Sequence, residues 1–343
     1  MPSSSSSRIS MQNVADALGV TKMTVSLALR NHPSISVRTR ARIVAHARKL
    51  GYTPNPLVSA LMANLRRGRV TKAPPIIAFV TVYPEAEFNI GIKRLIAGAQ
   101  ARASQLGYVI RVFSLADQQV SPARLAAILT SRGIRGLVIA PFPEPEDRFV
   151  MPWERFACAT IARSLKSPEL HRAHNNQYHS VLLAFERVWK RGYRRIGLVA
   201  EYQQSERCEH WWRNGFRLAA ERHGCLLRQC PIHLPHRLDA EPLARWFRRA
   251  APDAILSIDG RALAMLRQEN IRAPEDVGYA MLDLLENTPF CAGVNQNHEL
   301  IAAAAVDVVI EQLYNNELGV PSNPKSVMIE GVWAEGRTLR RQA

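Results

Sequence analysis

Several features common in proteins are scarce or missing from this chain of 343 residues. It has five cysteines, no two of them at a Cys-x-x-Cys spacing, so reduced thiols are favoured over a disulfide framework or a zinc site. No apolar run reaches the ~18–20 residues that a membrane helix requires. The polar start from Met1 to Arg8 lacks the apolar segment of a secretory signal. These absences predict a cytoplasmic protein.

The sequence also lacks the short motifs that mark common catalytic sites. It contains no Gly-x-Ser-x-Gly elbow, no Walker phosphate loop, no Gly-x-Gly-x-x-Gly and no His-Glu-x-x-His. His171, His174 and His179 lie close together, but no cysteine or carboxylate stands at a matching ligand spacing. We therefore predict that the protein is not an enzyme and needs no metal or cofactor.

Acidic residues are nearly absent from the first 72 positions, where Asp16 is the only one. The same segment contains 12 Lys and Arg residues, so it carries +11 of the chain's formal net charge of +16. Charge of one sign indicates a polyanion partner, because Lys and Arg that neutralise phosphates release condensed counterions. A solvated basic helical bundle without a nucleic-acid partner is the alternative that this segment leaves open.

The basic segment is patterned as a small helical unit. Apolar residues recur at helical spacing over 11–18 and 22–29, and Thr21 is a suitable N-cap for the second stretch. Gly19 suits the turn between them, because glycine adopts the left-handed conformation readily. A third helix is expected to start at Ser36. Two short helices joined by a turn with glycine predict a helix–turn–helix.

A further short helix is expected after the third one. Pro56 suits its first turn, where the missing N–H costs nothing. The helix has room for about two turns and is too short to be stable alone in water, so it must form against something else. The basic stretch with two prolines that follows, up to Pro75, has the composition of a linker.

These residues, in this order, resemble the DNA-binding headpiece of the lactose-repressor (LacI) family. The likeness runs without gaps from about Ile9 to Met62, through Val14-Ala15, Thr24-Val25-Ser26 and Tyr52-Thr53-Pro54-Asn55. It implies that the second helix enters the major groove. It also implies that the short helix folds on the operator beside its dimer mate, with Leu61 wedged between base pairs. By position, the DNA-binding residues would be Thr21, Lys22, Met23, Thr24, Ser26, Leu27, Arg30, Ser36, Asn55 and Leu61.

The sequence departs from the family pattern at two base-reading positions. Met23 and Leu27 stand where polar side chains are common in the family. They can contact thymine methyl groups but cannot form hydrogen bonds to base edges. Partial packing against the third helix is the other reading of these two residues. Lys22 is therefore the polar base reader that we expect.

From Ile76 onward, apolar strand-like runs alternate with helical stretches, which predicts parallel sheets with helices on both faces. The expected strands are 76–82, 108–113, 136–140, 157–161, 195–199, 254–258 and 278–282. The expected helices lie near 88–106, 121–132, 177–191, 206–223, 241–250, 261–270 and 298–316. The length of this part of the chain indicates two α/β lobes.

The resemblance extends over this part as well. Arg191-Gly192-Tyr193 and Asn214-Gly215-Phe216 are similar to motifs of the family's type I periplasmic-binding-protein-like core. The likeness implies a homodimer, a ligand between the lobes, and chain crossovers near Ile161, Val294 and Pro321. The expected domains are a helix–turn–helix headpiece (8–53), a hinge helix and linker (54–75), and a two-lobe effector-binding and dimerisation domain (76–340).

The family's effector cleft carries over to this sequence only in part. Asp283 matches an aspartate that binds sugar hydroxyls, and Gln296 matches a glutamine that faces the cleft. Trp212 replaces the family's sugar-binding arginine; either it or Trp211 could be a core residue instead. Asp259 could instead cap the loop in which it lies, and Tyr83 and Phe88 could merely pack the loop after the first strand. The expected effector-binding residues are Tyr83, Phe88, Trp212, Asp259, Asp283 and Gln296.

The sequence thus predicts a homodimeric transcriptional regulator, expected to be a repressor. Its partners would be a near-palindromic DNA operator and a sugar or nucleoside-like effector. A solute-binding protein or a sugar-processing relative on the same core is the alternative, which the match over residues 9–62 disfavours. The operator, the effector, the direction of its effect and the choice between activator and repressor stay open at this stage.

Overall fold

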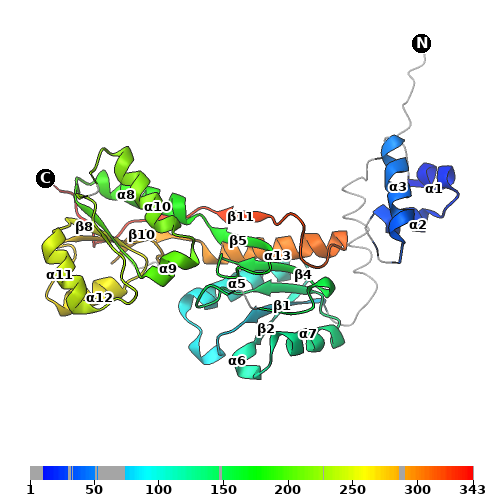
Figure 1. Cartoon of the computed structure of the whole chain (residues 1–343), viewed down its shortest axis with the longest axis horizontal. Coiled ribbons are helices and arrows are strands. Elements are labelled where there is room, and N and C mark those ends of the chain that lie inside the picture. The colour runs from blue at the N-terminus through cyan, green and yellow to red at the C-terminus, as the bar shows by residue number, and fades with distance from the viewer. Residues whose placement is uncertain are drawn as a thin grey trace, which may run out of the picture.

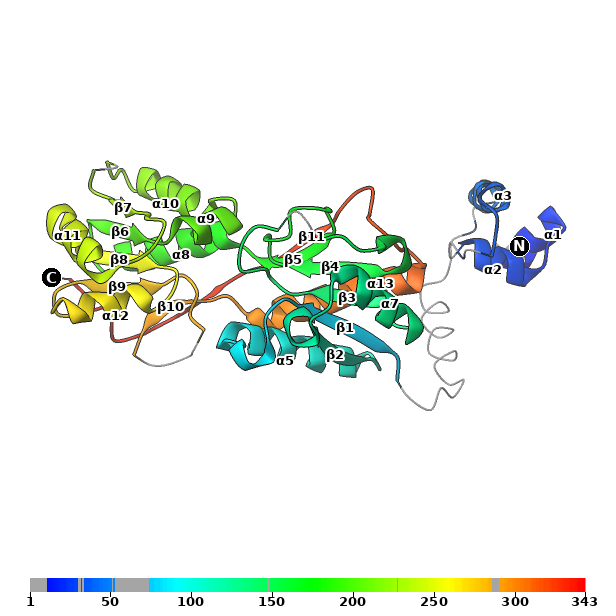
Figure 2. The ribbon, with the colours of Figure 1, turned by 60° about the horizontal axis from the view of Figure 1, so that its bottom comes forward.

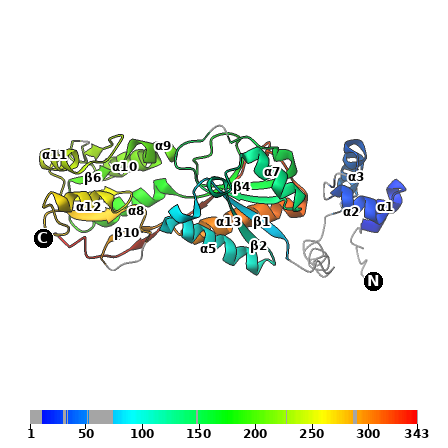
Figure 3. The same ribbon diagram turned by 90° about the horizontal axis from the view of Figure 1, so that it is seen from below.

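The computed structural model describes residues 11–29, 32, 34–50, 52, 74–146, 149–226, 228–285 and 290–342. The first helices are α1 (Met11–Leu18), α2 (Lys22–Leu29) and α3 (Val37–Lys49). In Figure 3 they lie apart from the rest of the chain, at the end of the molecule opposite the C-terminus. We call these three helices the headpiece.

Local signals in the sequence account for the headpiece helices. Gly19 has a φ of +64°, in the left-handed region that ends a helix sharply. The Thr24 N–H donates to Thr21 Oγ1 at 3.1 Å, and the Thr39 N–H donates to Ser36 Oγ at 3.2 Å, so both predicted caps form. A small shared core excludes water between the helices; its buried members are Val14, Ala15, Val25, Ala28, Ile43 and Ala47.

The lobe that follows, here the N-lobe, is built on a six-stranded sheet in the order β11-β5-β4-β3-β1-β2 (Figure 1). All neighbouring strands pair in parallel. Its strands are β1 (Ile76–Thr81), β2 (Val109–Ser114), β3 (Gly136–Ile139), β4 (Ala157–Ile161), β5 (His171–Asn175) and β11 (Ser326–Ile329). The long helices α5 (Ile90–Gln105) and α13 (His298–Asn315) share one core cluster, and α7 (Pro122–Ser131) packs in another. Alternate residues of β1 enter these two clusters, so both faces of the sheet are covered.

Helices α5 and α13 approach each other closely. A Cβ atom added at Gly98 would lie 2.2 Å from the backbone oxygen of Glu299. Only glycine fits there, because any other residue would overlap with the α13 backbone. Tight packing of these two helices holds the start of α13 beside α5. Residues near the N-terminal ends of both helices contact the other lobe.

The second lobe, here the C-lobe, repeats the same topology in the order β12-β10-β9-β8-β6-β7. Its strands are β6 (Ile196–Val199), β7 (Ile232–His233), β8 (Ala254–Ser257), β9 (Gly278–Met281), β10 (Ala292–Asn295) and β12 (Val332–Ala334). They are parallel except that β12 is antiparallel to β10. Helices α8 (Gln177–Trp189) and α10 (Trp211–Arg222) share one core cluster, and α11 (Ala240–Ala250) and α12 (Arg261–Gln268) share another. A short helix, α9 (Tyr202–Arg207), follows β6.

The chain passes between the lobes three times, as Figure 2 allows the reader to follow. It crosses at Asn176 after β5, at Gln296-Asn297 after β10, and at Glu330-Gly331 after β11. The crossover predicted near Val294 is confirmed, whereas those predicted near Ile161 and Pro321 are wrong. β5 and β11 each add one more strand to the N-lobe before the chain crosses. β5 has no apolar run that would have revealed it, and the run in β11 is short, Val327 to Ile329.

The predicted fold class, a helical headpiece followed by two parallel α/β lobes, is confirmed. In each lobe the sheet order places a switch point between two adjacent parallel strands, β1 and β3 in one and β6 and β8 in the other. Ligands of doubly wound sheets bind outside the carboxyl ends of strands at such points. The loops after these strands therefore define where a ligand site is to be sought.

Candidate DNA-binding surface and inter-lobe pocket

Helix α2 exposes the side chains that the sequence predicted to contact DNA. Met23 is 67 % exposed, and Thr21 and Lys22 at the start of the helix are also exposed. Thr24, Ser26 and Leu27 are half-buried, whereas Val25 and Ala28 form part of the core. The outer side of α2 is therefore free to approach another molecule. Of the predicted DNA-binding residues, Arg30, Asn55 and Leu61 lie outside the described residues.

The arginines of α3 have two different roles. Arg38, Arg42 and Arg48 are exposed and add positive charge to the surface of the headpiece. Arg40 instead turns inward, where its Nη2 donates to the backbone oxygens of His32 at 3.2 Å and Ile35 at 3.0 Å. Arg40 thus holds the turn before α3, a role that charge counting alone did not reveal.

A pocket of about 240 Å³ lies where the two lobes meet. Most of its wall comes from the C-lobe, at the carboxyl ends of β8 and β9, and Ile90 at the start of α5 contributes from the N-lobe. It is lined by Ile90, Asp259, Gly260, Met281, Asp283, Leu284, Leu285 and Cys291. Two of the six predicted effector residues, Asp259 and Asp283, are among these. Burial raises the pKa of the Cys291 thiol to about 11, so this thiol is neutral near pH 7.

Asp283 also forms a contact between the lobes. Its Oδ1 lies 2.8 Å from Nε2 of His298, the first residue of α13 in the N-lobe. Gln296, which precedes α13, is buried, and its Nε2 donates to the Leu282 backbone oxygen at 2.8 Å. Gln296 thereby fixes the second crossover next to the end of β9. Asp283 and Gln296, both predicted to bind the effector, therefore lie near each other at the end of β9. Asp283 lines the pocket, whereas Gln296 holds the crossover in position.

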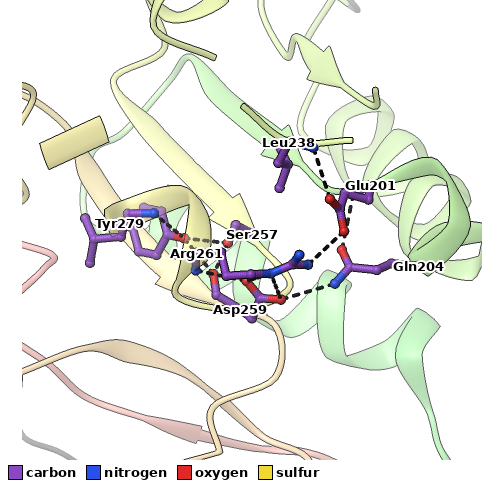
Figure 4. Close-up of polar contacts among 8 residues, drawn as sticks. Glu201, Gln204, Leu238, Ser257, Asp259, Arg261 and Tyr279 are labelled. Atoms are coloured by element: carbon purple, nitrogen blue, oxygen red, sulfur yellow. Dashed lines mark hydrogen bonds and ion pairs between the residues drawn. The ribbon is translucent and has the colours of Figure 1, made fainter. Parts of the chain in front are cut away.

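The carboxylate of Asp259 is held in a network that Figure 4 shows. Its Oδ2 accepts hydrogen bonds from Gln204 Nε2 at 3.1 Å and from Arg261 Nε at 3.0 Å. Arg261 also forms an ion pair with Glu201, 2.9 Å between Nη2 and Oε2, and Glu201 Oε1 accepts from the Leu238 N–H at 3.0 Å. These contacts tie the end of β8 to α9 across the switch point. Asp259 therefore shapes the pocket wall while much of its hydrogen-bonding capacity is already used.

The two adjacent tryptophans at the start of α10 point in different directions. Trp212 is 3 % exposed and packs in the C-lobe core with Phe216. Trp211 faces the N-lobe, with the Arg163 guanidinium carbon 4.9 Å from its ring centroid and the His174 ring edge-on at 5.5 Å. The structure thus places the predicted ligand residue Trp212 in the core, and its neighbour at the boundary between the lobes.

The two aromatic residues predicted after β1 also differ. Phe88 is buried in the N-lobe core, whereas Tyr83 is half-buried. Burial raises the pKa of the Tyr83 phenol, and the Arg207 guanidinium at the end of α9 opposes that rise. Tyr83 therefore lies close enough to Arg207 of the C-lobe for an electrostatic interaction between them. None of Tyr83, Phe88, Trp212 and Gln296 lines the 240 Å³ pocket itself.

Arg94 is a contact residue that the sequence did not single out. From α5 it donates to Glu299 Oε1 at 2.7 Å within the N-lobe, and to the Leu285 backbone oxygen at 2.7 Å in the C-lobe. Its Nη2 also lies 3.3 Å from Asn295 Oδ1. The hydrogen bond to Glu299 raises the pKa of Arg94, which stays charged. No composition or spacing signal marks an arginine in the middle of a helical pattern as an inter-lobe tether.

The three clustered histidines do not converge on one point. His171 Nδ1 accepts from the Lys325 N–H at 2.8 Å, His174 is buried beside Trp211, and His179 lies on α8. Over the described ranges, no group of three or more His, Cys, Asp or Glu side chains is arranged to hold a metal ion. In the same ranges no helix has the length and apolar character needed to cross a bilayer.

Comparison with known proteins agrees with this architecture. The family model "Bacterial regulatory proteins, lacI family" matches residues 10–55, and the model "Periplasmic binding protein-like domain" matches residues 185–332. The HTH-type transcriptional repressor CytR of Escherichia coli (strain K12) is 21 % identical over 323 residues, covering 90 % of this chain and 91 % of CytR. The HTH-type transcriptional regulator GntR of the same organism is 56 % identical over 45 residues, 13 % of this chain and 14 % of GntR.

A solved structure shows the same fold along nearly the whole chain. The lac repressor dimer bound to operator and the anti-inducer ONPF aligns with a TM-score of 0.56 and 16 % identity. The alignment covers 96 % of this chain and 98 % of that one. One chain thus contains both a headpiece like those of bacterial regulatory proteins and a core like those of periplasmic binding proteins. The protein combines the helix–turn–helix domain of the lacI family of bacterial regulatory proteins with a periplasmic-binding-protein-like domain, and it is a transcriptional regulator.

Proposed function

We propose that this regulator is a homodimeric repressor whose affinity for its operator is controlled by a small molecule bound between the lobes. The observation that carries the proposal is that one chain joins a basic headpiece, with an exposed side of α2, to two lobes that share a pocket. CytR, which aligns along 90 % of the chain, is a repressor. The repressor acts in the cytoplasm, where it meets DNA.

In this proposal α2 lies in the major groove of each operator half-site. Lys22 reads a base edge through its ammonium group, and Met23 and Leu27 contact thymine methyl groups. Thr21, Thr24, Ser26 and Ser36 position the helix through the DNA backbone, and Arg30 adds a phosphate contact. The exposure of Met23 at the tip of α2 supports this arrangement.

The headpiece domain spans 8–53, and residues 54–75 form the hinge helix and linker. Asn55 opens the hinge helix, and Leu61 enters the minor groove at the centre of the operator. The domain 76–340 dimerises and binds the effector. Each of these assignments rests on the position of the residue within the family motif.

The effector, a sugar or nucleoside-like molecule, binds in the inter-lobe pocket. Asp283 contacts its hydroxyl groups, since it lines the pocket with its carboxylate partly exposed. Asp259 and Tyr83 border the same region on either side of the lobe boundary. Phe88, Trp212 and Gln296 are buried and act by holding the walls in position.

Selection of bound sequences from a random DNA pool, followed by titration of the full chain on the selected site, tests the proposal. We expect one near-palindromic site, bound by a dimer. A solute-binding protein on the same core would bind a small molecule and select no DNA. Absence of any enriched sequence at low salt would therefore reject the proposed function.

A further inference from the structure

A second inter-lobe contact lies away from Asp283, at the turn between α9 and α10. Glu209 in this turn reaches the loop that follows β4 in the N-lobe. Its Oε2 lies 2.7 Å from Arg163 Nη2, and its Oε1 lies 3.4 Å from Lys166 Nζ. The Arg163 side chain is 17 % exposed and that of Glu209 is 39 % exposed, so solvent reaches the carboxylate side of the pair.

The turn that carries Glu209 is tightly fixed. Glu209 and His210 have φ values of +53° and +58°, two consecutive left-handed residues without a glycine. The His210 N–H donates to the Ser205 backbone oxygen at 2.7 Å, and the His210 ring nitrogen Nδ1 lies 2.9 Å from Ser205 Oγ. Left-handed backbone at non-glycine residues is strained and concentrates at functional sites. The backbone conformation and hydrogen bonds of this turn therefore hold the Glu209 carboxylate toward the N-lobe.

Positive charge is in excess around this carboxylate. The N-lobe contributes Arg163, Lys166 and Arg172, of which Arg172 is 6 % exposed. Burial lowers the pKa of Arg172, and the neighbouring Arg163 lowers it further, whereas Glu169 and Glu209 raise it. Burial raises the pKa of Glu209, but Arg163 and Lys166 outweigh that effect and lower it, so Glu209 is ionised. Three cationic side chains thus lie around Glu209, and Glu169, near Arg172, is the second carboxylate of the group.

Hydrogen-bonding capacity is also left unused beside Glu209. Arg163 Nε, on the residue paired with Glu209, is a buried donor with no hydrogen-bond partner among the described residues. His174 Nδ1 lies 2.8 Å from the Asn175 backbone oxygen, which can only accept, so Nδ1 carries the hydrogen. Burial lowers the pKa of His174, which is therefore neutral, and its Nε2 is an acceptor without a partner in the described part of the chain. Buried polar groups are normally satisfied, so such a cluster needs an explanation.

We infer that Glu209 occupies the place of an effector's anionic group, and that the effector is a small hydroxylated anion. Its carboxylate or phosphate binds Arg163 and Lys166 in place of Glu209, and a hydroxyl group reaches the His174 side. A sugar acid and a sugar phosphate share this chemistry. The inference deepens the proposed function and rests on it, because it assigns the effector's anionic group to an inter-lobe contact beyond the residues that line the 240 Å³ pocket.

Displacement of the Glu209 carboxylate by a bound anion would link effector binding to the relative position of the two lobes. The Arg163–Glu209 ion pair joins the N-lobe to the C-lobe, so an anion that replaces Glu209 removes one inter-lobe contact and supplies another. A ligand shifts a conformational equilibrium only by its differential affinity for the two states. Competition between ligand and Glu209 provides such a difference.

Calorimetric titration of the full chain, without DNA, with matched probes tests the inference. The probes are glucose, glucuronate, glucose 6-phosphate and inorganic phosphate. We expect at least one anionic sugar to bind at least about tenfold more tightly than glucose, because only it can pair with the half-buried cationic groups of Arg163 and Lys166. Glucuronate and glucose 6-phosphate distinguish a carboxylate from a phosphate as the preferred group, and inorganic phosphate reports the anion site alone.

Three variants sharpen the test. Arg163→Gln should weaken binding of the anionic probe about tenfold, and Lys166→Gln should weaken it less. Glu209→Gln should strengthen it, since the internal competitor is lost. Arg217→Gln, on the exposed side of α10, removes a positive charge elsewhere and should leave binding unchanged.

Several results would overturn the inference. One is equal binding of glucose and the anions, another is weaker anion binding in Glu209→Gln, and a third is the failure of every anionic probe to bind both wild type and Glu209→Gln. Operator binding measured without small molecules separates this failure from failure of the proposed function. If DNA binding is intact and no anion binds, only the anionic class is rejected; if no DNA is bound, the proposed function itself fails.

Discussion

His298 Nε2 lies 2.8 Å from Asp283 Oδ1, and the two residues belong to different lobes. Both side chains are shielded, at 13 % and 21 % exposure, so the contact is stronger than a surface pair would be. Asp283 also lines the inter-lobe pocket. A molecule that binds Asp283 therefore competes with, or reinforces, a contact that sets the relative position of the lobes.

A double-mutant cycle on this pair measures its coupling. We expect Asp283→Ala and His298→Ala to be non-additive by about 0.5–3 kcal/mol in the free energy of unfolding, as for residues in direct contact. Chemical denaturation of the two single variants and the double variant gives the coupling. Glu221→Ala, on the exposed face of α10, is the control and should combine additively with either change. Additivity of Asp283→Ala and His298→Ala within about 0.3 kcal/mol would show that the contact has no energetic role.

Binding to DNA should depend steeply on salt and require the headpiece. The first 72 residues carry a net +11, and phosphate neutralisation releases counterions. We expect operator affinity to fall by roughly 10³-fold or more between about 50 and 200 mM salt, if six or more phosphates are contacted. Deletion of residues 1–62 should abolish binding while leaving the two lobes folded, as circular dichroism would show. A flat salt dependence with tight binding would contradict this prediction.

The headpiece could be predicted from the sequence because its signals are local. Gly19, Thr21 and Ser36 fix helix ends through their own backbone or side chain, independent of the rest of the chain. The apolar strands of both sheets were predictable for a similar reason, since continuous burial leaves an apolar run. Most helices of the two lobes were also found to within a few residues.

Elements whose environment is non-local could not be predicted. The β5 residues His171 to Asn175 are mostly polar, yet all are buried between β4 and β11, so the strand was missed. The helix expected over 206–223 is interrupted at Glu209 and His210, which adopt left-handed backbone without glycine. That interruption decides which tryptophan faces the N-lobe. Neighbouring helical residues point about 100° apart at 3.6 residues per turn, so the choice between Trp211 and Trp212 needed the structure.

Lys22 should determine base preference at one position of each half-site. If its ammonium group reads guanine, Lys22→Ala should cost roughly 1–3 kcal/mol there and relax the preference, while Met23 and Leu27 favour thymine at theirs. Binding of the variant to a set of single-base operator changes measures this. Lys49→Ala, on the exposed end of α3, is a charge-matched control. Equal weakening on all sequences would reassign Lys22 to a phosphate contact.

Stability should fall as the pH is lowered below about 6.5, the pKa of an unperturbed histidine. Burial lowers the pKa of His174 in the folded protein, so the unfolded state binds the proton more readily. The contribution of neutral His174 is fully present above the unfolded pKa. It is lost at up to about 1.4 kcal/mol per pH unit as the pH falls toward the folded value.

The corresponding measurement compares thermal unfolding at pH 7.5 and pH 5.5, values chosen on either side of about 6.5. His174→Gln should show a smaller loss of stability on acidification than wild type. Gln203→Ala, at an exposed residue of α9 whose side chain does not titrate, should keep the wild-type slope. An unchanged slope in His174→Gln would mean that His174 does not contribute to the acid sensitivity.

Leu61 should be needed for operator bending. The residue lies outside the described part of the chain, so the prediction rests on the family motif and on the short, Pro56-led segment that cannot be a stable helix alone. A leucine inserted at a base step unstacks it at a cost of a few kcal/mol, which the added hinge contacts must offset. Leu61→Ala should reduce bending and specific affinity while sparing non-specific binding and ligand affinity without DNA. Gel mobility on circularly permuted operator fragments measures the bend, with Ser59→Ala as the neighbouring control. If Leu61→Ala bends DNA as wild type does, another residue must act at the operator centre.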